Sequence, residues 1–489
     1  MSLSRVLRTA ASLLFFLPAL ACHDYTFRPT NGSGAIGIYD DLYAVSVVDE
    51  KTVFAAGYFG TIYRSGDGGE KWLQQKTKTT LSIYDISMAD ENNGWAVGQI
   101  GIILHTNDGG KTWKLQENAK SQSQTNLFAV QALDANTAWA VGEWGSIITT
   151  INAGRTWQDN SLTIGLDDPS FQWLRPSDQE KVRNGGMVFR DVGLNDVFCR
   201  PLPSKSCWIV GEYGKVLYSQ DGGQNWNEGK ISGTSEQAPL AFKSGGTSIS
   251  EEASVRLNVL VKEIIDFPHL KIEIDPFVTK SEIASYLAME NGDPTLLFEL
   301  IEERAGEVNS VLIDENMYSD RIFTEGYPPW DWEDFVDDDP EFLNKYLAGR
   351  TKGSPNVGIR VLHRPYLFHV RFDNDLDGLI AGLGGILLET EDGGLTWGYS
   401  NSGTQEVLFA ATYSANRLIA VGEKGLVRVV SKGHEKWEKP RSGFPKLFSF
   451  FRDVSFEHQG QVGFMVGQKG TVLRSTDAGG TWEQVLPLQ

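Results

Sequence analysis

The sequence of 489 residues has few cysteines, few basic side chains relative to acidic ones, and no long hydrophobic run after its first 21 residues. Its formal net charge is −19, so it lacks the basic face that phosphate binding needs, and this excludes a nucleic-acid-binding protein. No stretch reaches the roughly 18 apolar residues of a membrane-spanning helix, so we expect no such helix in the mature chain.

The first residues are typical of a secretory signal. Arg5 and Arg8 give a positive start, an apolar region runs over 10–20, and the small residues of 19–21 suit a signal peptidase. Cys22 follows directly, as the acylated cysteine of bacterial lipoproteins does, although Ala19 stands where such motifs usually carry Leu. We therefore expect an exported, periplasmic protein with a lipid anchor at Cys22. The alternative is ordinary cleavage that leaves Cys22 as a free thiol.

Of the 3 cysteines, Cys199 and Cys207 lie eight residues apart in one expected hairpin. They can form a disulfide in an oxidising compartment, and Cys22 is then left over, as a lipid-modified residue would be.

One pattern recurs along the chain: an apolar run, Gly-x-x-Gly, a second apolar run, a polar Asp-Gly-Gly turn and a Trp. The clearest copy is WAVGQIGIILHTNDGGKTW, which ends at Trp113. The other copies end at Trp72, Trp157, Trp226, Trp397, Trp437 and Trp482. With the apolar segment before each copy, every unit offers four short strands in about 40 residues, the size of a propeller blade. We predict an all-β, seven-bladed propeller.

The spacing of these tryptophans places two insertions. We expect a signal peptide at 1–21, a tail at 22–39, blades one to four at 40–231 with a short insertion at 164–186, and blades five to seven at 364–489. The insertion at 232–363 carries 25 acidic and 11 basic side chains. Thr279-Lys280-Ser281-Glu282 is typical of a helix capping box, and Asp293-Pro294 and Asp339-Pro340 are typical helix starts. We predict a small acidic subdomain that contains helices.

The turn before each Trp resembles the Asp-box of BNR-type repeats. Its aspartates can accept hydrogen bonds from amides of their own turn, so we interpret them as structural. They are Asp67, Asp108, Asp221, Asp392 and Asp477, with Asn152 in the third copy. Asp373, Asp375 and Asp377 have the spacing of a calcium loop, but the twelfth position is Gly384 instead of Glu, and calcium binding stays open.

The middle residues of three Gly-x-x-Gly turns are large or acidic, and these turns share a face with the links from which both insertions emerge. Exposed aromatic side chains around a ring suggest a protein-binding surface. We take as partner-binding candidates Tyr58, Phe59, Glu143, Trp144, Glu212 and Tyr213. The alternative is that these side chains pack against the insertions.

The repeat resembles that of the photosystem II stability/assembly factor family, VGxxGxIxxTxDGGxTW, and blade two, Trp95 to Trp113, matches it almost residue by residue. The resemblance implies a non-catalytic assembly factor that binds a subunit of a membrane complex. Cyanobacterial members are exported and lipid-anchored. The large acidic insertion is not part of the family's core, and the repeat also occurs in bacteria without photosynthesis.

Two other functions remain open. Sialidases, which are glycoside hydrolases, also carry Asp-boxes on propellers, and Tyr25 to Pro29 faintly resembles their arginine motif. However, that segment precedes the first blade, and no matching Arg, Glu and Tyr set stands out. An accessory subunit of an envelope transporter is the second alternative. We assign no catalytic residue, cofactor or metal ligand, and we expect a protein partner with a basic segment.

Overall fold

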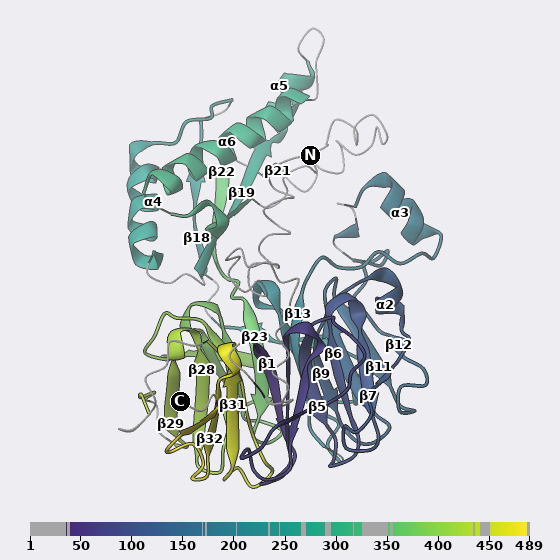
Figure 1. Cartoon of the computed structure of the whole chain (residues 1–489). Coiled ribbons are helices and arrows are strands. Elements are labelled where there is room, and N and C mark those ends of the chain that lie inside the picture. The colour runs from purple at the N-terminus through teal and green to yellow at the C-terminus, as the bar shows by residue number, and fades with distance from the viewer. Residues whose placement is uncertain are drawn as a thin grey trace, which may run out of the picture.

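The computed structural model describes residue 36 and residues 40–486, except 169, 172–173, 202, 233–234, 244, 266–269, 289–294, 316, 325–350, 353–355, 434–435 and 441–449. Short antiparallel strands make up most of this length (Figure 1). The predicted all-β class, with four-stranded antiparallel sheets as in a propeller, is confirmed. The described residues do not include the segment 1–21, Cys22, Tyr25 to Pro29, Asp293-Pro294 and Asp339-Pro340.

Seven sheets of the described chain follow chain order from strand to strand. They are β1–β4 (Leu42–Val47, Val53–Gly57, Ile62–Ser65, Leu73–Gln74), β5–β8 (Ile83–Met88, Gly94–Gly98, Ile103–Thr106, Lys114–Leu115), β9–β12 (Leu127–Ala132, Ala138–Gly142, Ser146–Thr150, Gln158–Asp159), β13–β16 (Leu194–Cys199, Cys207–Gly211, Val216–Ser219, Asn227–Glu228), β23–β26 (Leu367–Phe372, Gly378–Gly382, Leu387–Thr390, Thr396–Ser400), β27–β29 (Leu408–Tyr413, Arg417–Gly422, Val427–Ser431) and β30–β33 (Phe451–Phe456, Gly463–Gly467, Val472–Ser475, Glu483–Leu486). A short parallel strand, β17 (Lys230–Ile231), is added to β26.

The first strands of these sheets line the middle of the ring. They pack side by side in the order β1, β5, β9, β13, β23, β27 and β30, and β30 packs in turn against β1. Second strands such as β6 and β14 are buried along their whole length, as their unbroken apolar sequences predict. Fourth strands such as β4 and β8 are exposed, as expected of an outer edge.

The tryptophan that ends each repeat packs between two neighbouring sheets. Trp72 joins the apolar cluster between the last and the first sheet, where its ring meets that of Phe464 edge-on at 6.2 Å. Trp113 joins the cluster between the first two sheets, and Trp482 joins the one between the last two. These large buried side chains explain why the repeat ends on Trp: each one fills the space between two neighbouring sheets, which widens away from the middle of the ring.

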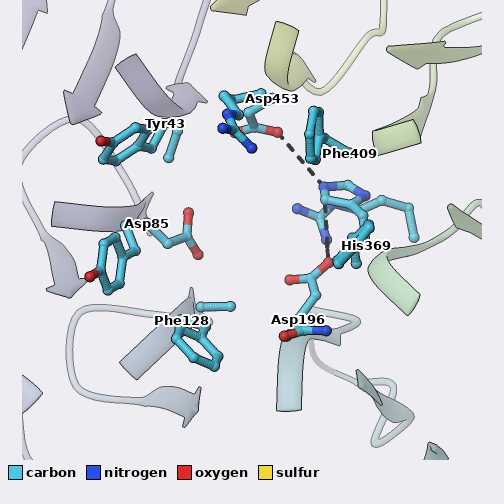
Figure 2. A pocket seen from close by; sticks show the side chains of 14 residues that line it. Tyr43, Asp85, Phe128, Asp196, His369, Phe409 and Asp453 are labelled. Carbon is cyan, nitrogen blue, oxygen red and sulfur yellow. Dashed lines mark hydrogen bonds and ion pairs between the residues drawn. The ribbon is translucent and has the colours of Figure 1, made fainter. Parts of the chain in front are cut away.

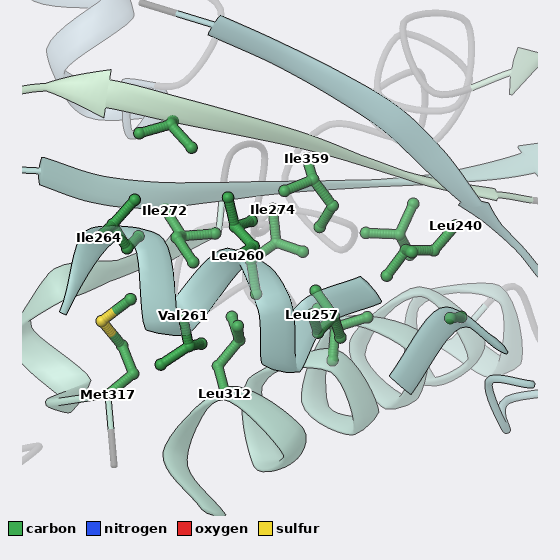
Figure 3. Packing of buried hydrophobic residues seen from close by; sticks show 14 of the residues in the cluster. Leu240, Leu257, Leu260, Val261, Ile264, Ile272, Ile274, Leu312, Met317 and Ile359 are labelled. Atoms are coloured by element: carbon green, nitrogen blue, oxygen red, sulfur yellow. The ribbon is translucent and has the colours of Figure 1, made fainter. Parts of the chain in front are cut away.

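The segment between β17 and β23 folds around a core of its own. Strands β18 (Ser235–Ala241), β22 (Asn356–His363), β19 (Leu270–Thr279) and β20 (Ile322–Thr324) form one sheet, in which β21 (Thr351–Lys352) also pairs with β19. Helices α4 (Glu251–Ile264), α5 (Lys280–Leu287) and α6 (Thr295–Asp314) accompany it. Leu257, Leu260, Ile272 and Leu312 meet in its core (Figure 3). The sequence predicted the helices here but not this sheet.

The predicted capping box begins α5. The amide of Thr279 donates to Glu282 at 2.9 Å, and the amide of Glu282 donates to the Thr279 hydroxyl at 3.1 Å. Glu282 also pairs with the buried guanidinium of Arg304 at 2.6 Å. This segment lies to one side of the ring, as do α2 (Ala119–Ser123) and α3 (Pro176–Arg183) (Figure 1). No helix in the described ranges is long and apolar enough to cross a membrane.

Candidate functional site

The Gly-x-x-Gly turns have one geometry around the ring. In each turn the backbone amide of the first middle residue donates to a carbonyl in the link that enters the same sheet. Examples are Tyr58 to Asp41 at 2.9 Å and Glu212 to Gly193 at 2.9 Å. The second middle residue has a left-handed backbone, and this is a residue other than glycine in six of the turns: Phe59, Ile100, Trp144, Tyr213, Lys424 and Lys469.

This backbone geometry turns three aromatic side chains outward. The exposed fractions of Phe59, Trp144 and Tyr213 are 36%, 51% and 40%, so these rings are not covered by the insertions. A left-handed conformation costs a side chain other than glycine about 1 kcal/mol. In the fifth blade Gly384 occupies the same position, so a turn without a side chain is compatible with the fold.

The two acidic candidates hold the backbone. The carboxylate of Glu143 accepts both the main-chain and side-chain amides of Asn126, at 3.0 and 2.9 Å. Glu212 accepts the amide of Gly193 at 2.9 Å. Tyr58 is half-buried, with its ring 5.9 Å from that of Phe59. In the structure, Glu143 and Glu212 therefore position the links. That they also bind a partner stays a prediction.

The structure adds a cavity of about 110 Å³ in the middle of the ring, which the sequence did not predict (Figure 2). It is lined by second and third residues of the first strands, together with Arg371 of β23, at the end where the Gly-x-x-Gly turns lie. The pairing register shifts at the second residue in every first strand, so that residue has no partner across the sheet. Such bulges re-aim side chains, and here they line the channel.

Five of these second residues are aromatic. They are Tyr43, Tyr84, Phe128, Phe368 and Phe409. Asn195 and Arg452 occupy the same position in the other two sheets. Successive ring centroids lie 6.2 Å apart from Tyr43 to Tyr84 and from Tyr84 to Phe128. The guanidinium of Arg452 lies over Phe409 at 4.2 Å.

The third residues connect neighbouring sheets. Asp85 accepts the amide of Val130 at 2.7 Å, Asp196 accepts that of Val370 at 2.9 Å, and Asp453 accepts that of Val45 at 2.8 Å. In each pair the donor lies on the next sheet. His369 accepts the amide of Ala411 through Nδ1 at 3.4 Å. In the other three sheets this position holds Ala44, Ala129 and Ala410, so a sheet forms without a polar side chain there.

Burial controls the electrostatics of this cavity. It raises the pKa of Asp85 to about 7 and that of Asp453 to about 6. Burial also raises the pKa of Asp196, although Arg371 at 2.7 Å opposes the shift, and it lowers the pKa of His369 far enough to keep the ring neutral. The neutral ring accepts through Nδ1, so its proton is on Nε2, which lies 3.7 Å from Asp453 and 3.9 Å from Asp196.

The Asp-box aspartates are structural, as predicted. In each box the Ser or Thr hydroxyl two residues earlier donates to the aspartate, which also accepts the amide four residues later, as between Asp221 and Asn225 at 3.0 Å. Hydrogen bonds, first that from the Asn225 amide, lower the pKa of Asp221 to about 2. In the third repeat, Asn152 replaces the carboxylate with its amide oxygen.

The candidate calcium loop uses its carboxylates elsewhere. Asp373 pairs with Lys432 at 2.9 Å, Asp375 pairs with Arg200 at 3.1 Å, and Asp377 accepts the side-chain amide of Asn374. Within the described residues, no group of three or more His, Cys, Asp or Glu side chains could hold a metal ion. Cys199 and Cys207 form a disulfide between β13 and β14, with 4.1 Å between their Cα atoms.

Part of the chain matches a family of known proteins that has the same kind of repeat. Residues 74–192 match the model of a family described as photosynthesis system II assembly factor YCF48. No curated protein matches the chain. Among solved structures, YCF48 bound to a D1 peptide is 14% identical, with a TM-score of 0.49 over 90% of this chain and 93% of that one. YCF48 from Cyanidioschyzon merolae is 12% identical, with a TM-score of 0.49 over 90% of this chain and 96% of that one.

A third similar structure is PorZ, a surface component of the type-IX secretion system of Porphyromonas gingivalis. It is 9% identical, with a TM-score of 0.45 over 93% of this chain and 39% of that one. The chain is therefore similar to the photosystem II assembly factor family over residues 74–192, where the family model covers the second and third sheets of the ring.

Proposed function

We propose that this chain is a non-catalytic, exported, seven-bladed propeller that acts as an assembly factor or scaffold by binding a protein of a membrane complex. The binding surface is the face that carries the Gly-x-x-Gly turns. The family model matched by residues 74–192 describes an assembly factor, which supports this class of function. Export and anchoring through a lipid on Cys22 would place the chain at the membrane where such a complex forms.

The exposure of Phe59, Trp144 and Tyr213 is the observation that carries the proposal. Each ring is displayed by a backbone conformation that disfavours its side chain, while the fifth blade makes the same turn with Gly384. The same conformation occurs at Ile100, Lys424 and Lys469, so the three aromatic positions differ from the other turns in exposing a large ring. Large rings in this arrangement are the residue types that anchor protein interfaces.

The acidic insertion beside this face favours a partner with a basic segment. Its long-range attraction would speed association and would weaken as salt is added.

Replacing both Trp144 and Tyr213 by alanine tests the proposal. We expect capture of the native partner from envelope membranes to fall at least about tenfold, because two anchoring rings are lost. The matched control is the double change of Lys424 and Lys469 to alanine, which alters two turns of the same backbone conformation without removing a ring. Quantitative mass spectrometry of the captured proteins measures both variants against the natural chain. Equal capture by the aromatic variant would contradict the proposed surface.

A further inference from the structure

One wall of the central cavity carries a carboxylate without a cation beside it. The carboxylate of Asp85 faces the middle of the cavity, between Tyr43 and Phe128 (Figure 2). Among the described residues, no cationic group lies within ion-pair distance of it. Its hydrogen bonds come from two backbone amides, those of Ile86 and Val130, both at 2.7 Å. Burial disfavours the ionised form of such a carboxylate, and a cation in the cavity would stabilise that form.

The other charged groups of the cavity lie on other first strands of the ring. Arg371 pairs with Asp196 at 2.7 Å, and His369 lies between Asp196 and Asp453. Arg452, the other cation of the cavity, lies over the ring of Phe409. Asp453 and Asp196 raise the pKa of Asp85 and Arg371 lowers it, but Arg371 is itself paired with Asp196.

Aromatic rings flank this carboxylate. Tyr43, Tyr84 and Phe128 follow one another at 6.2 Å between ring centroids, on three neighbouring first strands, with Asp85 among them. A set of aromatic faces around a negative group is the arrangement with which proteins hold organic cations. The cavity volume of about 110 Å³ accepts the end of one side chain or a small amine.

A purely structural role for Asp85 explains less of the arrangement. Its carboxylate does join two sheets through Val130. Yet Ala44 and Ala129 occupy the equivalent positions on both neighbouring first strands, so a sheet of this ring forms without such a carboxylate. Joining the sheets also gives no reason for an aromatic side chain at each neighbouring bulge.

We propose that Asp85, Tyr43, Tyr84 and Phe128 form a binding site for an alkylammonium group in the central cavity. The group belongs either to a lysine of the protein partner, in which case this inference rests on the proposed function, or to a free small amine. The ammonium pairs with the Asp85 carboxylate, and its alkyl chain lies against the three rings.

Titration with n-butylammonium chloride tests the site, and 1-butanol serves as the neutral match. Ligand-detected NMR and calorimetry on the full chain should show binding of the cation and at least about tenfold weaker binding of the alcohol. Burial raises the pKa of Asp85 to about 7, so binding of a cation near neutral pH should release protons into the buffer. At about pH 5 the carboxyl group is neutral, and affinity should fall about tenfold or more.

Two pairs of variants locate the site. Asp85→Asn should abolish binding of butylammonium, whereas Asp453→Asn, which changes the residue at the equivalent position of the last sheet, should retain it. Tyr84→Leu leaves the Asp85 hydrogen bonds in place and keeps the test valid if Asp85→Asn does not fold. It should weaken binding about two- to fivefold, and the matched change Phe368→Leu should not. Binding that persists in Asp85→Asn, equal binding of butanol, or no binding of butylammonium would each overturn the proposal.

Peptides distinguish the source of the ammonium group. A lysine peptide that binds more tightly than butylammonium, and more tightly than its norleucine equivalent, identifies a partner side chain. Equal affinity of the peptide and the free amine identifies a small amine. Both results require the proposed site of Asp85, Tyr43, Tyr84 and Phe128. The variant with Trp144 and Tyr213 replaced should still bind butylammonium, so failure of the outer surface and failure of the cavity site give different results.

Discussion

The carboxylate of Asp453 accepts the backbone amide of Val45 at 2.8 Å, which joins the last sheet of the ring to the first. Its other oxygen accepts the amide of Val454 on its own strand at 2.8 Å. These contacts hold together residues from opposite ends of the described chain, at the seam between the last sheet and the first. Closure of the ring therefore depends on a side chain as well as on the apolar cluster around Trp72 and Phe464.

Asp453→Ala should lower the free energy of unfolding by about 2–4 kcal/mol, because it leaves two amides beside the cavity without an acceptor. Urea unfolding followed by fluorescence measures the change. Asp373→Ala is the control, since it removes only a half-exposed ion pair with Lys432 and should cost less than about 1 kcal/mol. An equal loss in the two variants would show that Asp453 does not hold the seam.

The pH dependence of stability should report on Asp85. Burial raises its pKa to about 7, above that of an unfolded aspartate, so between about pH 4 and 7 the folded chain holds the proton more tightly. This group's contribution to stability is therefore present at low pH and is lost as the pH rises through 7. Asp453, Asp196 and His369 also titrate in the cavity, so the difference between the natural chain and Asp85→Asn isolates the effect.

Thermal unfolding of the two proteins across that pH range checks the sign. The natural chain should lose about 1–3 kcal/mol relative to Asp85→Asn as the pH rises. Parallel curves for Asp85→Asn would mean that its carboxyl group ionises as it does in the unfolded chain.

Repeated local features allowed the sequence to predict the four-stranded units, the capping box of Thr279 and Glu282, and the Asp-box turns. Each depends on residues close in sequence, so its pattern is legible without the fold. The cavity depends on a one-residue bulge and on strands that meet only when the ring closes. Its signal is an aromatic residue directly after the first apolar residue of the strand, as in Leu42-Tyr43-Ala44 and Ile83-Tyr84-Asp85, and this pattern also fits a strand that is wholly buried.

The sheet of the insertion was missed for a similar reason. Its strands β18 and β22 pair although the helices of the insertion lie between them in the chain. The roles of Glu143 and Glu212 were also beyond the sequence, because their amide partners lie in links whose paths only the fold determines.

Glycine at the two displayed turns should separate stability from binding. Trp144 and Tyr213 have φ values of 56° and 57°, which glycine adopts without strain. Trp144→Gly and Tyr213→Gly should therefore leave the free energy of unfolding unchanged or raise it by up to about 1 kcal/mol each, while partner capture falls. Chemical unfolding and the capture assay measure the two effects. Glycine in place of Val97, in a buried strand, is the contrast and should destabilise clearly. A loss of stability at the turns would mean that these rings support the fold.

Removal of the acidic insertion should leave a folded ring. The insertion's core cluster contains only its own residues, from Leu240 to Val361, and it is separate from the clusters between the propeller sheets. Both ends are held on the ring: the Ser232 amide donates to Trp397 at 2.9 Å, and the Gly214 amide donates to Pro365 at 2.7 Å. A short Gly/Ser link from Ser232 to Arg364 keeps these contacts and shortens a surface loop, which costs little entropy.

The shortened protein should be soluble, show the β-sheet circular dichroism of the ring, and unfold within about 5 °C of the natural chain. A second deletion that also removes Lys230 and Ile231 is the control, because these residues form β17, which pairs with β26 beside the buried Trp397. That deletion should unfold at a clearly lower temperature. An insoluble product of the first deletion would mean that the insertion supports the ring, because the link itself retains both anchoring contacts.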